Sequence, residues 1–277
     1  MRIDSHNHFW IYNELDYGWI SDELSILKRN FVPEDILVEL NKNQLDGCIA
    51  VQARQSLEET EWLLKLADKN DYIKGVVGWV DLRSNSVESQ LAKFSKNPKF
   101  VGVRHVVQDE QDENFVLSEA FLNGISLLSK YNLTYDILIF ESQLPSVIQL
   151  VNKFPNQKFV VDHIAKPQIK KGLISPWKEN IAKLATFTNV YCKLSGMLTE
   201  ADWNDWTVDD FNVYFNVVFY CFGSDRLMYG SDWPVCQLAG TYQQTLSLIT
   251  DYMCKYTDQQ KASVLGENAF KFYLNNK

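Results

Sequence analysis

The sequence predicts an α/β protein that folds as one closed (β/α)8 barrel of the TIM type, spanning residues 1–277 as a single domain. Eight short apolar runs, rich in β-branched and aromatic residues, recur along the chain, and a segment with helical periodicity follows each run. No Gly-rich or Pro-rich linker divides the chain. Apolar strands that alternate with helices indicate a parallel sheet covered by helices, and eight such units are typical of a closed barrel. A doubly wound open sheet is the alternative.

The apolar runs give the expected strand positions. We expect strands at residues 2–9, 46–52, 73–80, 100–107, 133–140, 158–164, 190–195 and 227–232. Helix openings lie between them. Pro33 suits a first helical turn, and the pair Ser56 and Glu59 forms a capping-box pattern that Thr257 and Gln260 repeat near the end.

The segment after the first strand, FWIYNELDYGWI at residues 9–20, is rich in aromatic side chains. It is too long for a simple connection between a strand and a helix. We expect it to form a lid over one end of the barrel.

Composition and charge exclude several classes of protein. The formal net charge of -8 argues against a nucleic-acid partner, which needs clustered Lys and Arg. No apolar run approaches the roughly 18 residues of a membrane span. The five cysteines show no C-x-x-C spacing, which predicts reduced thiols rather than disulfides or a zinc-thiolate site. We therefore expect a cytoplasmic monomer or homodimer without a nucleic-acid or membrane partner.

Polar side chains gather where the expected strands end. Barrel enzymes build their active sites from the loops at the carboxyl ends of the strands. All four histidines of the chain and two aspartates share this location. They are His6, His8, His105, Asp136, His163 and Asp232.

The first strand carries two of these histidines one position apart. Because side chains alternate between the two faces of a strand, His6 and His8 share one face and Asn7 takes the other. Two imidazoles on one face can converge on a metal ion, a water or a substrate oxygen.

Each of these residues also has a purely structural interpretation. A histidine at a strand end can form an ordinary hydrogen bond, and Asp232 can cap the turn before Pro234. Asp136 lies inside an apolar run, where a carboxylate requires a buried partner. The joint placement of all six residues on one end of the barrel favours the functional interpretation.

Five motifs, in order along the whole chain, resemble the amidohydrolase superfamily. They are IDSHNHFW, DHIAKP, YCKLSG, RLMYGSDWPV and GENAFKFY. Within the superfamily they are most similar to the lactonase branch, which includes L-fuconolactonase, L-rhamnonolactonase and pyrone-dicarboxylate lactonase. The resemblance implies a (β/α)8 barrel that hydrolyses an intramolecular ester, with roles for His6, His8, His163 and Asp232.

The chain departs from the metal-dependent members of that superfamily at two places. Those members generally carry a histidine on strand five or a lysine on strand four, where this chain has Asp136 and His105. The departure argues against a binuclear site. It leaves one zinc-compatible divalent site formed by His6, His8 and Asp232, with a fourth position for water. The resemblance leaves open whether activity requires the metal.

These observations lead to a mechanistic hypothesis for a sugar lactonase. Asp232 activates water, His163 polarises the carbonyl group, and His105 assists or protonates the leaving oxygen. A neutral aldonolactone, such as L-fucono- or L-rhamnonolactone, suits a chain without an arginine cluster. The expected substrate-binding residues are Trp19, Gln52, Trp79, Asp136 and Trp233.

Two other classes of function compete with this hypothesis. The same superfamily contains metal-dependent decarboxylases and related lyases, which act on aromatic or small carboxylic acids. A carbohydrate-binding barrel without catalytic activity is the third interpretation.

Overall fold

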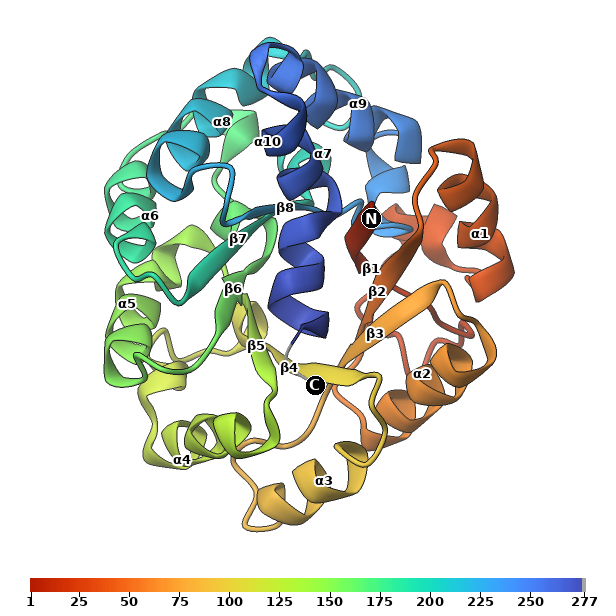
Figure 1. The fold of residues 1–277 in the computed structure, drawn as a ribbon, viewed down its shortest axis with the longest axis vertical. Helices are drawn as coiled ribbons and strands as arrows, with labels where there is room; N and C mark the ends of the chain where they lie inside the picture. The colour runs from red at the N-terminus through yellow and green to blue at the C-terminus, as the bar shows by residue number, and fades with distance from the viewer. Residues whose placement is uncertain (276–277) are drawn as a thin grey trace.

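Eight parallel strands follow one another in chain order around the centre of the molecule, as Figure 1 shows for the computed structural model, which describes residues 1–275. They are β1 (Ile3–Asn7), β2 (Gly47–Val51), β3 (Ile73–Gly78), β4 (Phe100–Val106), β5 (Thr134–Leu138), β6 (Phe159–Val161), β7 (Val190–Leu194) and β8 (Leu227–Tyr229). All eight expected strands are present. The sixth and eighth stop three residues early, because the chain leaves the extended conformation before His163 and Asp232.

The first and last strands meet at their carboxyl ends. The His8 N–H donates to the carbonyl oxygen of Trp233 at 2.8 Å, and the Asp232 N–H donates to that of His6 at 2.9 Å. A doubly wound sheet would place β1 inside the sheet, where the strand order reverses, and would leave the sheet open. The contact between them therefore confirms the (β/α)8 barrel.

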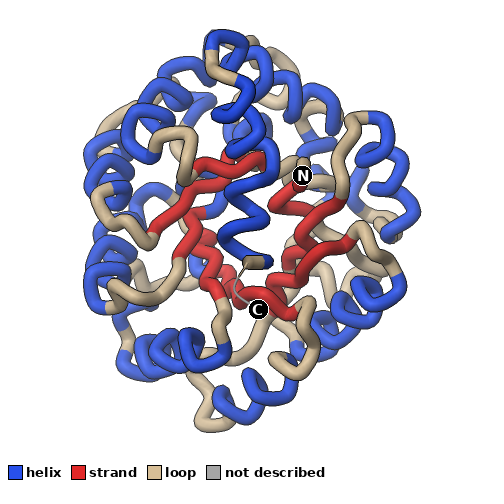
Figure 2. Tube along the Cα trace, viewed as in Figure 1, coloured by secondary structure: helices blue, strands red, loops and turns tan. Residues whose placement is uncertain are grey.

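Helices surround the strands as an outer layer (Figure 2). They are α1 (Pro33–Lys42), α2 (Leu57–Lys69), α3 (Val87–Phe94), α4 (Glu119–Leu128), α5 (Leu144–Lys153), α6 (Trp177–Ala185), α7 (Met197–Glu200), α8 (Asp209–Phe222), α9 (Tyr242–Tyr252) and α10 (Asp258–Ala262). None of the helices within residues 1–275 is both long and apolar enough to cross a membrane.

The predicted helix starts are present, with one difference. Pro33 opens α1, and Thr257 caps α10 by accepting the N–H of Gln260. Ser56 likewise caps α2. The Glu59 side chain, however, does not close the expected capping box.

Glu59 instead joins α2 to the loop after β2. Its carboxylate accepts the backbone N–H groups of Ala53 and Arg54, both at 3.0 Å. It also accepts the hydroxyl of Tyr17, from the predicted lid, at 3.3 Å. Trp10, in the same segment, forms two backbone hydrogen bonds of 2.9 Å with Phe31. The segment 9–20 is thus packed against the carboxyl end of the barrel.

The amino-terminal end of the barrel is closed by the chain after α10. In Figure 1 this dark blue segment crosses the centre of the strands. Its Phe272 and Tyr273 pack with Ile3 and Met228 in the apolar cluster inside the barrel. At Gly266 the segment approaches β1 so closely that a Cβ atom would lie 2.4 Å from the Met1 carbonyl oxygen. The interior of the barrel is therefore filled at this end by described residues of the chain.

The buried carboxyl group of Glu59 makes stability depend on pH. Burial raises its pKa to about 7 from 4.5, so this group favours the folded state below pH 4.5 and loses that contribution as the pH rises through 7. We expect the difference in unfolding free energy between Glu59→Gln and the wild type to shift in favour of the variant from pH 5 to pH 8, by on the order of 2 kcal/mol. Urea unfolding at both pH values measures the shift.

The exposed neighbour Glu58 supplies the control, because Glu58→Gln keeps the length of the side chain without affecting a buried charge. A difference between Glu59→Gln and the wild type that is equal at both pH values would contradict the expectation.

Candidate active site

A pocket of about 470 Å³ opens at the carboxyl end of the barrel. Its volume lies within the range usual for small-molecule sites. It is lined by His8, Trp19, Ala53, Arg54, Gln55, Arg104, Val106, Gln108, Asp109, Leu138, His163, Lys166, Asp232 and Val235.

Two histidines and one aspartate converge at the floor of this pocket. The Nε2 atoms of His6 and His8 lie 3.2 Å apart. Oδ1 of Asp232 lies 3.7 Å from Nε2 of His6 and 3.4 Å from Nε2 of His8. The alternation along β1 that predicted a shared face for the two histidines is therefore present, and the end of β8 brings Asp232 to the same point.

The chemistry of these three groups fits one divalent cation. His8 donates its Nδ1 hydrogen to the carbonyl oxygen of Val51 at 2.8 Å, so its Nε2 carries a lone pair. Nε2 of His6 lies 3.2 Å from Nη1 of Arg104, and in the tautomer whose Nδ1 hydrogen points toward Oδ1 of Asp162 this nitrogen carries a lone pair as well. Two lone pairs and a carboxylate thus face one another. Tetrahedral zinc, with ligands at about 2.0–2.2 Å, would separate them by about 3.3 Å.

Carboxylates behind the pocket hold His6 and the turn at Asp232 in place. Nδ1 of His6 faces Oδ1 of Asp162 at 3.4 Å, the carboxylate–histidine arrangement that orients metal-binding imidazoles. The fully buried Asp4 accepts the N–H and the hydroxyl of Ser231, at 2.8 and 2.6 Å, and the hydroxyl of Tyr242 at 2.9 Å. These bonds fix the turn that carries Asp232.

His163 reaches the pocket through an unusual backbone turn. Four successive residues, from His163 to Lys166, have φ between 46° and 61°. Each non-glycine residue in this left-handed region costs about 1–2 kcal/mol. The turn has a geometric consequence, since it lets the adjacent residues Asp162 and His163 both contact His6. On a regular strand they would point to opposite faces.

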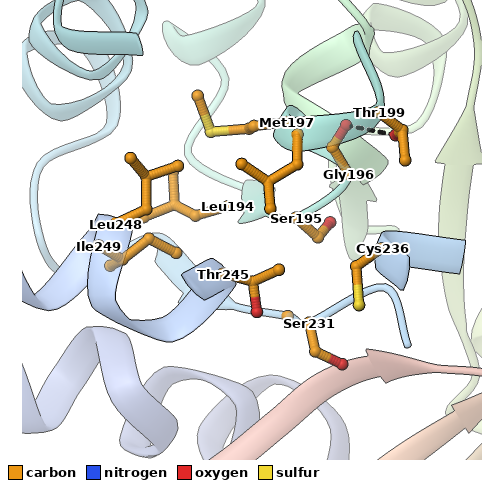
Figure 3. A pocket seen from close by; sticks show the side chains of 12 residues that line it. Leu194, Ser195, Gly196, Met197, Thr199, Ser231, Cys236, Thr245, Leu248 and Ile249 are labelled. Carbon is orange, nitrogen blue, oxygen red and sulfur yellow. Dashed lines mark hydrogen bonds between the residues drawn. The ribbon is translucent and has the colours of Figure 1, made fainter. Parts of the chain in front are cut away.

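Ser195 and Gly196 hold the ring of His163 from behind. Ser195 Oγ lies 2.9 Å from Nδ1 of His163, which leaves Nε2 for the pocket. A Cβ atom on Gly196 would lie 2.5 Å from the same Nδ1, and the φ of Gly196 is +61°. Figure 3 shows both residues beside a second hollow. That hollow encloses about 10 Å³, which is no more than about one water molecule requires.

A cluster of paired charges lies at the barrel axis beneath the pocket. The Lys193 ammonium contacts Asp136 at 2.5 Å and Asp162 at 3.0 Å, and Arg104 contacts Asp162 at 3.1 Å. Lys193 and both aspartates are fully buried, and Arg104 is 3% exposed. Two cations offset two carboxylates, so the cluster carries no net charge.

Burial sets the protonation of the groups in the pocket. It holds the pKa of both His6 and His163 well below 6.5, so these rings are neutral at pH 7. Burial also opposes ionisation of Asp232. Interactions with His163, His8 and Lys166 outweigh it, and the pKa of Asp232 lies below its ordinary value. The site thus pairs an ionised carboxylate with neutral imidazoles.

His105 is absent from the pocket, contrary to expectation. Its neighbour Arg104 faces the barrel axis, so alternation turns His105 outward toward the helices. There it stacks on Phe115 at 4.8 Å, and its Nε2 contacts Glu110 at 2.7 Å. Trp79 donates to its Nδ1 at 3.3 Å. Both nitrogens are engaged, and Trp79 does not line the pocket either.

The other expected substrate-binding residues lie partly in the pocket and partly in the interior. Trp19 lines the pocket. Trp233 is 2% exposed and packs against Phe9 and Phe31, so it belongs to the core. Gln52 and Asp136 are fully buried beneath the pocket, where Gln52 accepts from Arg104 at 3.1 Å and Asp136 pairs with Lys193.

Three residues of the site were not predicted from the sequence. Asp162 stands next to His163 in a motif already noted, and Lys193 lies inside the apolar strand VYCKLS. A lysine in such a strand is a usable signal, because a buried ammonium requires a carboxylate partner. Arg104 and His105 are adjacent, and the sequence did not reveal which one faces inward.

The sequence profile described as amidohydrolase matches residues 3–274. An L-fucono-1,5-lactonase from Burkholderia multivorans is 34% identical over 99% of this chain and 96% of its own length.

Solved structures give the same result. The crystal structure of an amidohydrolase from Burkholderia multivorans with bound Zn is 36% identical, with a TM-score of 0.95 over 99% of both chains. A dihydroxybenzoic acid decarboxylase from a Polaromonas species has a TM-score of 0.71 over 100% of this chain and 97% of its own, but at 12% identity it shares the fold alone. The profile match and the close relatives agree with the site geometry, and the chain belongs to the amidohydrolase family.

Proposed function

We propose that this protein hydrolyses a sugar-derived lactone, an aldonolactone such as L-fucono- or L-rhamnonolactone, to the open aldonic acid. The observation that carries the proposal is the convergence of His6, His8, His163 and Asp232 on one pocket. The 34% identity with an L-fucono-1,5-lactonase over nearly the whole chain supports the same reaction. The decarboxylase alternative rests on a distant likeness of fold.

Asp232 is the proposed base for the attacking water. Its carboxylate is ionised at neutral pH, lies at the floor of the pocket and is 4% exposed. A positioned base that removes the proton as the oxygen attacks typically accelerates such a step by about 10²–10⁴-fold. The same carboxylic acid can then return that proton to the ring oxygen as the ester bond breaks. This transfer replaces the role expected of His105, which lies outside the pocket.

His163 is the proposed donor to the carbonyl oxygen. When the Ser195 hydroxyl donates to Nδ1, the neutral ring carries its hydrogen on Nε2, which is left for the pocket. A hydrogen bond aimed at the oxygen that becomes negative stabilises the transition state more than the substrate. The buried Ser195 thus selects the tautomer that the reaction requires.

The metal belongs to this proposal as a zinc ion on His6, His8 and Asp232. When bound, zinc supplies a positive charge that polarises water and lowers its pKa toward about 7. The ionised Asp232 and the neutral imidazoles provide the ligand forms that such a metal needs. In the absence of the metal, the two histidines would orient the water instead.

Two arginines and a lysine line the pocket, contrary to the expectation of a site without clustered arginines. Each of them is paired with a carboxylate, and the remaining walls suit a neutral polyol ring. Trp19 offers an apolar ring face at the entrance, and Gln55 and Gln108 bring amide groups from the loops after β2 and β4. Oε1 of Gln55 accepts the Val106 N–H at 3.0 Å, which leaves the amide nitrogen as a donor. Side chains of this kind bind hydroxyl groups and fix the orientation of the ring.

Activity against a panel of lactones tests the proposal directly. A pH-indicator assay should detect acid release from aldono-1,5- and 1,4-lactones, because each turnover converts a neutral ester to a carboxylic acid. The same assay with a chelator, beside elemental analysis of the protein, measures how far turnover depends on zinc. Inactivity toward all sugar lactones, together with carbon dioxide release from aromatic acids, would favour a decarboxylase.

Removal of the proposed base should abolish most activity. Asp232→Asn keeps the shape of the side chain but cannot accept a proton, so kcat should fall by about 10²–10⁴-fold. Circular dichroism should show an intact barrel. Turnover within a factor of ten of the wild type would exclude Asp232 as the base.

Two histidines with opposite placements form a matched pair. His163→Gln should lower kcat by about 10²–10³-fold, the usual loss when one donor to an oxyanion is removed. His105→Gln should keep kcat within about threefold and lower the thermal midpoint instead, since His105 packs in the core outside the pocket. Equal loss of kcat in both variants would contradict the assignment.

A further inference from the structure

We propose that Tyr273, near the end of the chain, is a positioning residue that orients His6 through Asp136, Lys193 and Asp162. The segment that closes the amino-terminal end of the barrel would then also set the geometry at the opposite, catalytic end. The inference rests on the proposed metal site and adds a residue to it that lines no part of the pocket.

Four contacts connect Tyr273 to His6. The Tyr273 hydroxyl donates to Oδ2 of Asp136 at 2.7 Å, and Nζ of Lys193 donates to the same oxygen at 2.5 Å. Nζ of Lys193 also lies 3.0 Å from Oδ1 of Asp162. That Oδ1 in turn lies 3.4 Å from Nδ1 of His6. Beside these four contacts, Nζ of Lys193 lies 3.1 Å from Nδ1 of His6 directly. Between Tyr273 and His6, the charges of Asp136, Lys193 and Asp162 alternate in sign.

The Asp136 carboxylate is held by few hydrogen bonds. Within residues 1–275, its Oδ1 has no hydrogen-bond partner, so its two hydrogen bonds both fall on Oδ2. Removal of the Tyr273 hydroxyl would leave Lys193 as the sole donor. The Asp136 carboxylate would then draw the ammonium group more strongly, and the contact between Lys193 and Asp162 would weaken.

Burial makes these contacts strong enough to transmit a shift. Asp136, Asp162, Lys193 and His6 are fully buried, and Tyr273 is 2% exposed. Without water to replace a lost bond, the buried charges can compensate only by moving toward one another. A displaced Lys193 or Asp162 would turn the His6 ring, because both lie against its Nδ1 and the groups behind an imidazole set its orientation toward a metal.

A purely structural role for Tyr273 is the alternative, and the two roles are separable. The ring packs against Phe272 at 4.8 Å and lies 5.6 Å from Nζ of Lys193, so it also fills the barrel and faces a cation. Tyr273→Phe keeps the ring and both of these contacts. It removes only the hydroxyl and therefore isolates the proposed relay.

The test compares Tyr273→Phe with Tyr214→Phe in the full-length protein. Tyr214 is 1% exposed, and its hydroxyl donates to the Leu173 carbonyl at 3.0 Å, far from the barrel axis. Zinc affinity is measured on metal-free protein with a competing chromophoric chelator, and kcat, KM and the thermal midpoint are measured on the same preparations. The visible spectrum of the Co²⁺-loaded protein reports the coordination geometry.

Tyr273→Phe should lower zinc affinity and kcat by about 10-fold, the lower end of the effect of groups that orient metal ligands, with KM unchanged. The Co²⁺ spectrum should also change. Tyr214→Phe should change only the thermal midpoint. If Tyr273→Phe folds poorly, the same measurements are made on Asp136→Asn, which keeps the shape of the side chain and weakens the ion pair with Lys193.

Zinc affinity and a Co²⁺ spectrum equal to the wild type in Tyr273→Phe would overturn the relay. Equal changes in both tyrosine variants would show a structural role and overturn it as well. Failure of the wild type to bind zinc would refute the metal site instead, and the ratio of kcat between the two variants would still decide the relay. The outcomes for the relay and for the proposed function are therefore distinct.

Discussion

The paired charges at the barrel axis are the constraint on which the rest of the structure depends. Lys193 and Arg104 pair with Asp136 and Asp162, all four residues are at most 3% exposed, and each buried ion without its partner would cost several kcal/mol. The four residues come from β4, β5 and β7 and from the position just after β6. The cluster is therefore neutral only when these strands hold their register. His6 contacts Asp162 and Arg104 of this cluster, and it lies at the floor of the pocket.

Two kinds of backbone geometry deliver side chains to the pocket. Regular alternation places His6 and His8 together on β1, and it also sends Arg104 inward and His105 outward on β4. Left-handed residues deliver the others, since His163 and Asp232 both have positive φ just after their strands end. Strained backbone of this kind persists where the surrounding structure holds it, as Trp177 does by donating to the Ile164 carbonyl at 2.7 Å.

The two ends of the barrel have different roles. The segment after α10 fills the amino-terminal end with apolar side chains, while the loops at the carboxyl end form the pocket. This division is the general rule for barrel enzymes. Here the charge cluster spans the interior between the two ends and touches Tyr273 on one side and His6 on the other.

The sequence by itself determined the order of the eight strands, the helix starts at Pro33 and Thr257, and the shared face of His6 and His8, because these features follow from local periodicity and capping. It did not determine which of Arg104 and His105 faces inward, nor that Lys193, Asp162 and Asp136 meet. Those choices depend on which side chains find a partner across the barrel, and partners from different strands become neighbours only when the sheet closes. Tertiary structure therefore decided the environment of the site, while local sequence determined the elements that carry it.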